Sequence, residues 1–168
     1  MIIGDVTLAS GRQASYYVDA RRALMRPVAF RAAGELIAAA AAEHGAVAVG
    51  GPTTGAIPLA CAAISADGGE ELAGFFVRSE RKQHGLQRWI EGAAAEGARC
   101  LVVEDTVTTG GSVVTAIERI RSEGLEIARV LCVVDRLAGG AEAIEAAAEA
   151  PFEALYTIDD VYPDRPDT

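Results

Sequence analysis

Residues 100–120 read CLVVEDTVTTGGSVVTAIERI, and this stretch decides the fold. An apolar run, residues 100–103, is followed by Glu104 and Asp105, then by a tract of Thr and Gly. The run is short and uniformly apolar, which is typical of a buried parallel strand. Residues 112–123 then place their apolar side chains on one face of a helix. The stretch therefore predicts a strand, a loop and a helix in direct succession.

The same alternation of strand-like and helical runs continues outward along the chain. It is typical of βαβ units, in which helices cover both faces of one parallel sheet. The predicted strands are residues 46–50, 73–77, 100–103 and 129–134, and the predicted helices are residues 28–44, 57–65, 112–123 and 141–148. Residues 6–19 instead predict a hairpin-like pair. We therefore expect an α/β fold with a mostly parallel central sheet flanked by helices, in a single domain of residues 1–168.

Composition limits the classes of function. The chain has 168 residues, 51% of them hydrophobic, and a net charge of −9, which argues against capture of nucleic acid because that needs a basic face. No apolar run is long enough to cross a bilayer and no secretory signal opens the chain, so we expect a soluble cytoplasmic protein. Cys61, Cys100 and Cys132 each lie among apolar residues, and we expect three buried, reduced thiols.

The Thr-Gly tract has the features of an anion-binding loop. Gly110 and Gly111 allow backbone angles at which several N–H groups point at one anion, and the helix start adds partial positive charge. Glu104 and Asp105 would repel a phosphate, but they can accept hydrogen bonds from a ribose diol, directly or through Mg²⁺-bound waters. The segment predicts a site for a ribose 5-phosphate. A solvated strand end before a turn and a capped helix fits the composition equally well.

Two common nucleotide-binding motifs do not match. No Lys-Ser or Lys-Thr follows the glycines, and the three-glycine spacing of a dinucleotide fingerprint is missing. Residues 102–112, VVEDTVTTGGS, instead strongly resemble the motif with which type I phosphoribosyltransferases bind 5-phosphoribosyl 1-diphosphate (PRPP). Within them, the chain resembles the orotate phosphoribosyltransferases over almost its whole length. The resemblance implies the type I phosphoribosyltransferase fold, with residues 1–20 as a small N-terminal hood, Mg²⁺ as cofactor and a homodimer.

Residues 78–92, RSERKQHGLQRWIEG, form a basic segment in an otherwise acidic protein. Their pattern predicts a long exposed loop, and a charge run alone is more often a solvated surface. A reaction that expels pyrophosphate needs cations and exclusion of water, which a flexible basic lid would supply. The resemblance implies such a lid, which reaches the active site of the neighbouring subunit. Arg78, Lys82 and His84 would contact pyrophosphate, with Lys82 as the main catalytic contact, and Ser79 stands where a second Lys is usual.

Residues 50–58, GGPTTGAIP, place a Gly-Pro turn before a helix and so offer backbone N–H groups to an anion. From the residues alone a simple βα turn is favoured, whereas the resemblance implies a pyrophosphate-binding loop. Many members of the family have Lys where this chain has Gly55, so the amides of Thr53, Thr54 and Gly55 would serve instead. Ala9 likewise replaces a Lys that often precedes the Ser-Gly-Arg stretch.

Two further motifs concern the base. Residues 10–19, SGRQASYYVD, resemble the family stretch whose second aromatic lies near the pyrimidine, which implies that role for Tyr17, although a strand aromatic is more often core. Arg136 follows a predicted strand in VVDR, where an arginine can hold a carboxylate bidentately or form a surface ion pair. The resemblance implies that Arg136 binds the orotate carboxylate and that Thr108 also contacts the pyrimidine.

The resemblance, together with these features, implies transfer of the phosphoribosyl group from PRPP to orotate, which gives orotidine 5′-monophosphate and pyrophosphate. Glu104 and Asp105 would hold the ribose hydroxyls, with Mg²⁺ nearby. The 5-phosphate would be held by Thr106, Val107, Thr108, Thr109, Gly110, Gly111 and Ser112.

Two rival functions remain at this point. A purine-base phosphoribosyltransferase would have no carboxylate to meet Arg136, and a non-catalytic PRPP- or nucleotide-sensing regulator would be consistent with the missing lysines. The family also usually has a helix ahead of the Ser-Gly-Arg stretch, and this sequence has only a few residues there. Part of the floor of the pyrimidine pocket is therefore expected to be missing or to lie upstream of Met1.

Overall fold

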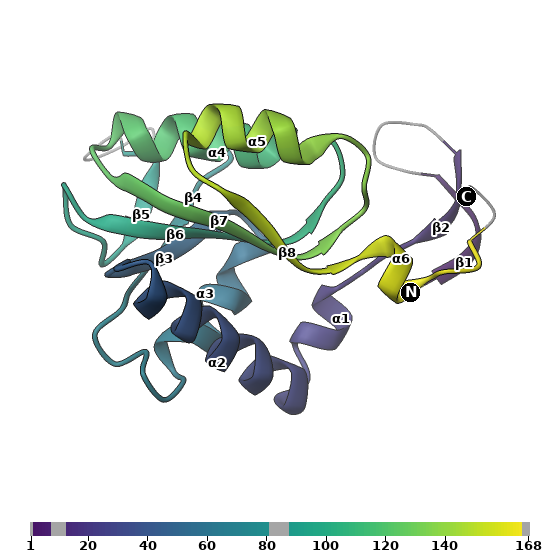
Figure 1. The fold of residues 1–168 in the computed structure, drawn as a ribbon, viewed down its shortest axis with the longest axis horizontal. Coiled ribbons are helices and arrows are strands. Elements are labelled where there is room, and N and C mark those ends of the chain that lie inside the picture. Colours follow the sequence, from purple (N-terminus) through teal and green to yellow (C-terminus); the bar gives the residue numbers. More distant parts are fainter. Residues whose placement is uncertain (1, 8–12, 81–87, 166–168) are drawn as a thin grey trace.

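A six-stranded sheet forms the centre of the structure, a computed structural model that describes residues 2–7, 13–80 and 88–165 (Figure 1). The strand order is β5-β4-β3-β6-β7-β8, and only the pair of β4 and β5 is antiparallel. The strands are β3 (Ala48–Pro52), β4 (Ala73–Val77), β5 (Ile90–Gly92), β6 (Arg99–Val107), β7 (Glu126–Asp135) and β8 (Phe152–Thr157). The predicted α/β fold with a mostly parallel sheet is confirmed.

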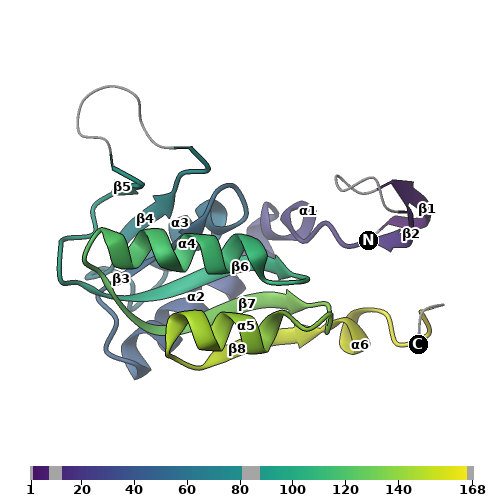
Figure 2. The ribbon, with the colours of Figure 1, turned by 90° about the horizontal axis from the view of Figure 1, so that it is seen from above.

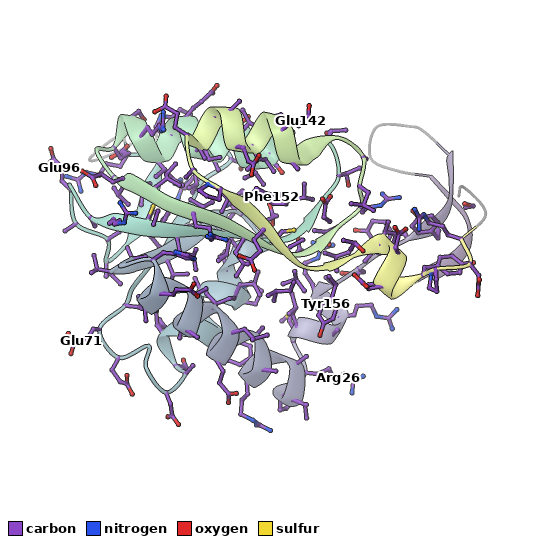
Figure 3. The ribbon with its side chains drawn as sticks, viewed as in Figure 1. Arg26, Glu71, Glu96, Glu142, Phe152 and Tyr156 are labelled. Atoms are coloured by element: carbon purple, nitrogen blue, oxygen red, sulfur yellow. The ribbon has the colours of Figure 1, made fainter. Side chains whose placement is uncertain are left out.

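Helices cover both faces of this sheet (Figures 1 and 2). One face carries α2 (Pro27–Glu43) and α3 (Ala56–Ile64), and the other carries α4 (Gly111–Ser122) and α5 (Gly140–Ala148). Successive residues of β6 point to opposite faces, so Leu101 packs with the α2 and α3 core and Val102 with the α4 and α5 core. Phe152 of β8 packs against the latter core (Figure 3). Burial on both faces explains the uniformly apolar strands.

Two elements that the periodicity did not predict complete the sheet. β8 is only half-buried along its length, so its sequence lacks the continuous apolar run of the inner strands. β5 has three residues, too few to show any periodicity, and it lies within residues 78–92, which we expected to form a loop throughout. That expectation was wrong for residues 90–92, because they pair with the end of β4. The short helices α1 (Arg21–Leu24) and α6 (Ile158–Val161) were also missed.

A separate two-stranded sheet lies at one end of the molecule (Figure 2). β1 (Ile2–Thr7) and β2 (Gln13–Tyr17) pair in antiparallel fashion, which confirms the predicted hairpin-like pair. Ala9 and the Ser-Gly-Arg stretch lie outside the described residues. Tyr16 is buried against Val134 and Ile158, so the end of β2 is anchored beside the end of β7. No helix in the described part of the chain has the length and apolar character that a membrane span requires.

The cysteines differ from one another. Cys100 and Cys132 are buried in strands, as predicted, and burial raises the pKa of the Cys100 thiol to about 12. The prediction was wrong for Cys61, which is exposed. It lies in α3 between Ala60 and Ala62, which are buried, and α3 buries only one side against its neighbours.

Candidate active site

The carboxyl ends of the parallel strands surround a cavity of about 330 Å³. Ligands bind at this edge in open α/β sheets. Most of the residues predicted for the site line this cavity together, namely Tyr17, Thr53, Thr54, Gly55, Glu104, Asp105, Thr106, Thr108, Ser112 and Arg136. Val18 and Arg21, which the sequence did not single out, also line it. Lys82 and His84 lie outside the described residues.

The acidic pair lies within β6 rather than after it. We expected the strand to end at Val103, but it continues through Thr106 and Val107 because Val107 pairs with Asp135 of β7. Val107 is 1% exposed and belongs to the core, so the loop itself begins only at Thr108. Glu104 is 6% exposed, and its Oε1 accepts a hydrogen bond of 3.0 Å from the backbone N–H of Asp105. The two carboxylates thus form one wall of the cavity.

Burial changes the protonation of Glu104. Loss of hydration raises its pKa to about 8, the negative charge of Asp105 adds to the rise, and Arg21 opposes it. The shift favours the neutral carboxyl of Glu104, which can donate as well as accept a hydrogen bond. Asp105 is less buried, and its Oδ2 lies 3.7 Å from Nε of Arg21.

The raised pKa predicts how stability depends on pH. The folded protein binds a proton at Glu104 that the unfolded chain releases near pH 4.5, so this carboxyl contributes stability at low pH that is lost as pH rises through about 8. Glu104→Gln removes the titration and keeps the shape. We expect its melting temperature to be close to that of the wild type at pH 5 and to exceed it by about 10 °C at pH 9.

Thermal unfolding followed by circular dichroism at pH 5, 7 and 9 checks this expectation. Glu71→Gln removes an exposed acid and serves as the control, with no comparable trend. A constant difference between Glu104→Gln and the wild type across this range would contradict the assignment.

The predicted phosphate loop, residues 108–110, packs closely on α5. Gly110 has a φ of +77°, which favours glycine, and a Cβ atom there would lie 2.9 Å from the carbonyl oxygen of Gly140. A Cβ atom on Gly140 would lie 2.8 Å from the carbonyl oxygen of Thr108. Gly140 therefore sets the loop position, and the only signal for it in the sequence was the Gly139-Gly140 pair. The helix α4 begins at Gly111, one residue earlier than predicted.

The loop after β3 lies against the acidic pair. Thr53 is fixed by hydrogen bonds from its backbone N–H and its hydroxyl to the carbonyl oxygen of Val77, and the Thr53–Thr54 peptide bond is cis. Gly55 is buried, and a Cβ atom there would fall well inside contact distance of the Glu104 and Asp105 carboxylates. The absence of a side chain at residue 55 is therefore what allows this loop to approach the carboxylates.

Arg136 lies at the end of β7, on the opposite wall. Its backbone N–H donates a 2.9 Å hydrogen bond to the carbonyl oxygen of Val107, and its guanidinium carbon lies 5.0 Å from the centre of the Tyr16 ring. Its buried Nε has no hydrogen-bond partner among the described residues. A buried cationic donor without a partner is suited to an anionic ligand. The sequence assigned Tyr17 to the site but missed Tyr16, which supports the arginine.

Arg21 is a second cation of the cavity. Its Nε lies 3.2 Å from Oδ1 of Asp19 and its Nη2 donates to the hydroxyl of Tyr17 at 3.2 Å. The hydrogen bond with Asp19 is the main reason that its pKa is raised. Sequence reasoning missed Arg21 because α1 has only four residues and shows no periodicity. The available signal was a pair of arginines directly after the hairpin in an acidic chain.

Arg78 lines a neighbouring cavity of about 190 Å³, together with Ser79, Arg119 and others. Thr53 and Ser112 line both cavities, so this space adjoins the main site on the side of the Thr53–Gly55 loop. The Arg78 guanidinium lies between the carbonyl oxygen of Glu80, 3.2 Å from Nε, and Oε1 of Glu91, 3.4 Å from Nη1. Arg78 thus borders this second cavity, while its guanidinium contacts Glu80 and Glu91.

Comparison with known proteins identifies the family. Residues 25–149 match the profile of the phosphoribosyl transferase domain. The chain is 45% identical over 161 residues to the orotate phosphoribosyltransferase of Corynebacterium glutamicum (strain R), covering 96% of this chain and 86% of that protein. It is 47% identical over 146 residues to that of Mycobacterium tuberculosis (strain CDC 1551 / Oshkosh), covering 87% and 81%.

Solved structures agree with these sequence relationships. The crystal structure of the Mycobacterium tuberculosis H37Rv orotate phosphoribosyltransferase in complex with PRPP superposes with a TM-score of 0.80 at 39% identity, covering 95% of this chain and 91% of that chain. The adenine phosphoribosyl transferase of Trypanosoma brucei, at 12% identity and a TM-score of 0.69, covering 90% and 73%, shares the fold. The chain belongs to the phosphoribosyltransferase family and, within it, to the orotate phosphoribosyltransferases.

Proposed function

We propose that this chain transfers the 5-phosphoribosyl group of PRPP to orotate and releases pyrophosphate, a step of pyrimidine synthesis. The observation that carries the proposal is one cavity lined jointly by the acidic pair, by Thr108 and Ser112 of the phosphate loop and by Arg136. These groups match the diol, the 5-phosphate and the base carboxylate of the two substrates. Relatives that are 41–47% identical and named orotate phosphoribosyltransferase support the same activity.

In the proposed reaction, the bond between C1 of the ribose and the pyrophosphate oxygen breaks, and pyrophosphate leaves with the electron pair. A ring nitrogen of orotate bonds to C1 and loses its proton. The developing positive charge on the ribose lies near Asp105, and the 5-phosphate lies at the start of α4, where backbone N–H groups lack helical partners. Electrostatic stabilisation of this kind is usually the largest contribution to such rates.

Glu104 and Asp105 would bind the ribose diol in different ways. Asp105 accepts hydrogen bonds, whereas a protonated Glu104 can donate one to a hydroxyl oxygen and accept another. Glu104 lies deep beside Gly55, so its carboxyl has little freedom to move. The pair is therefore suited to fix the orientation of the sugar ring relative to the base.

Mg²⁺ fits this wall as a metal shared with the substrate. No group of three potential side-chain ligands occurs among the described residues, and only the two adjacent carboxylates are available in the cavity. Mg²⁺ commonly binds through one or two carboxylates together with substrate oxygens and water. Asp105 would hold such an ion, together with Glu104 once that carboxyl releases its proton, and the ion would neutralise charge on the pyrophosphate.

The basic segment would complete the site. Arg78, Lys82 and His84, carried over from the family motif, would reach the pyrophosphate of a partner chain, which requires a homodimer.

A spectrophotometric assay of orotate consumption with PRPP and Mg²⁺ tests the function. We expect turnover of orotate with a kcat/KM at least about 10⁴ times that for adenine, because adenine has no carboxylate to pair with Arg136. Turnover of adenine in preference to orotate would identify a purine enzyme. Binding of PRPP without turnover of either base would identify a regulator, and either result would reject the proposal.

A further inference from the structure

A short C-terminal segment, residues 157–162, lies beside the strand end that Arg136 follows. β7 and β8 are parallel, and Asp135 at the end of β7 pairs with Thr157 at the end of β8. β8 then turns directly into α6, whose first residue, Ile158, is fully buried. α6 lies at the end of the molecule that carries the two-stranded sheet (Figures 1 and 2). The segment is therefore placed next to the wall of the main cavity that carries Arg136.

Side-chain and backbone hydrogen bonds fix the conformation of this segment. α6 has only four residues, too few for a helix to be stable through its own backbone bonds. Oδ2 of Asp160 accepts hydrogen bonds of 2.7 Å from both the backbone N–H and the hydroxyl of Thr157, as part of a capping box. The N–H of Tyr162 then donates to the carbonyl oxygen of Ile158 at 2.8 Å. These bonds determine where the Tyr162 side chain leaves the backbone.

The ring of Tyr162 packs against the ring of Tyr16 in β2. The two ring centres are 5.6 Å apart and the ring planes are at 90°, which is the favoured edge-to-face arrangement. Tyr16 is 3% exposed and belongs to a buried cluster with Val18, Val134 and Ile158. Val18 also lines the main cavity. We call Tyr16 and Tyr162 the tyrosine pair, and through it the C-terminal segment reaches the inner side of the cavity wall.

The guanidinium of Arg136 is the other neighbour of Tyr16. Its carbon lies 5.0 Å from the centre of the ring, within the range of a cation–π interaction. Nε of Arg136 is buried and has no hydrogen-bond partner among the described residues, so no bond from this atom fixes the plane of the group. A guanidinium binds a carboxylate bidentately only when the two planes are matched. The orientation of Arg136 therefore depends on the ring of Tyr16, and the position of that ring depends on Tyr162.

We propose that the tyrosine pair positions Arg136 for the carboxylate of the base, with Tyr162 holding Tyr16 and Tyr16 holding the guanidinium. This inference rests on the proposed function for the identity of the carboxylate. Neither tyrosine lines the main cavity, so both act through Arg136. Loss of the pair would weaken recognition of the carboxylate and leave the ribose and 5-phosphate positions unchanged, because these lie on β6 and at the start of α4. The C-terminal segment thereby contributes to base specificity.

Orotidine 5′-monophosphate and uridine 5′-monophosphate test this inference, because they differ only in the carboxylate of the base. Calorimetry measures the affinity for each nucleotide without turnover, and we expect the wild type to bind orotidine 5′-monophosphate at least about tenfold more tightly. Tyr16→Leu removes the ring face beside Arg136 and is expected to weaken this binding about tenfold. Tyr162→Ala removes the ring edge that holds Tyr16 and is expected to weaken it about fivefold. Affinity for uridine 5′-monophosphate is expected to stay within about 1.5-fold in both variants.

Conservative replacements and a matched control separate positioning from general packing. Tyr16→Phe keeps the ring face and Tyr162→Phe keeps the ring edge, so both are expected to retain the affinity for orotidine 5′-monophosphate within about twofold. Tyr156→Ala removes an exposed tyrosine from β8, six positions before Tyr162, and is expected to change neither affinity.

The two nucleotides also distinguish failure of this inference from failure of the proposed function. A wild-type preference for orotidine 5′-monophosphate that is unchanged in folded Tyr16→Leu and Tyr162→Ala proteins would overturn the inference. So would equal losses for both nucleotides, which would show that the pair only supports the fold, or a loss in Tyr156→Ala as large as in Tyr162→Ala. Equal affinity of the wild type for the two nucleotides would instead reject the role of Arg136 in the proposed function, and the inference with it.

Discussion

Arg136→Ala is expected to lower kcat/KM for orotate by about 10²–10³-fold while the affinity for PRPP stays within about twofold of the wild type. The guanidinium is held by its backbone bond to Val107 and by the Tyr16 ring, and its buried Nε lacks a partner among the described residues. Orotate would then lose a charge pair formed away from water. Steady-state kinetics with each substrate varied in turn measures both effects.

Uracil, which is orotate without its carboxylate, provides the control on the substrate side. Its slow turnover or weak binding is expected to be nearly the same in Arg136→Ala and in the wild type. Arg136→Lys keeps the charge without the bidentate geometry and is expected to be intermediate. An equal loss for orotate and uracil would show that Arg136 only supports the fold.

Lys82→Ala is expected to lower kcat by about 10²–10³-fold with a much smaller change in PRPP affinity. The lysine would meet negative charge that develops on pyrophosphate as the bond to C1 breaks, so it contributes mainly in the transition state. The proposal for Lys82 rests on the family motif, since the residue lies outside the described part of the chain. Single-turnover kinetics together with calorimetric binding of PRPP separates the two effects.

Arg81→Ala removes the neighbouring positive charge and serves as the matched variant, with an expected change in kcat of about twofold or less. Equal kcat with weaker PRPP binding in Lys82→Ala would contradict the catalytic role. A mixed dimer of Lys82→Ala and Arg136→Ala chains then tests the action of the lysine across the interface. Random re-pairing of the two variant chains makes about half of the dimers mixed, and each mixed dimer has one intact site of its two. About a quarter of the wild-type activity is therefore expected.

Local signals in the sequence were sufficient for the main architecture. The inner strands are apolar on both faces, and the helices between them end at glycines such as Gly45 and Gly124, both with positive φ. The Thr-Gly loop between β6 and α4 was predicted from its own residues. Elements without such a local signal, such as the half-buried β8 and the short β5, could not be found in this way.

Long-range contacts determine what the sequence could not predict about the site. The extension of β6 through Val107 depends on pairing with β7, and that pairing places Glu104 in the interior. The contact of Tyr16 with Arg136 joins residues 120 positions apart, and Gly140 approaches the phosphate loop from the start of another helix. Apart from the Gly139-Gly140 pair, none of these relations has a periodic or motif-like trace in the sequence.

The tight approach of Gly55 to Glu104 and Asp105 limits how this enzyme can be engineered. A lysine in place of Gly55, which the family resemblance led us to expect, would bring its first side-chain carbon into both carboxylates. The backbone of residues 53–55 would have to move away from Glu104 and Asp105, which would change the shape of the cavity wall that these two carboxylates form. A cation can be added at residue 55 only together with a change at Glu104 or Asp105, because a side chain there and the two carboxyls would occupy the same space.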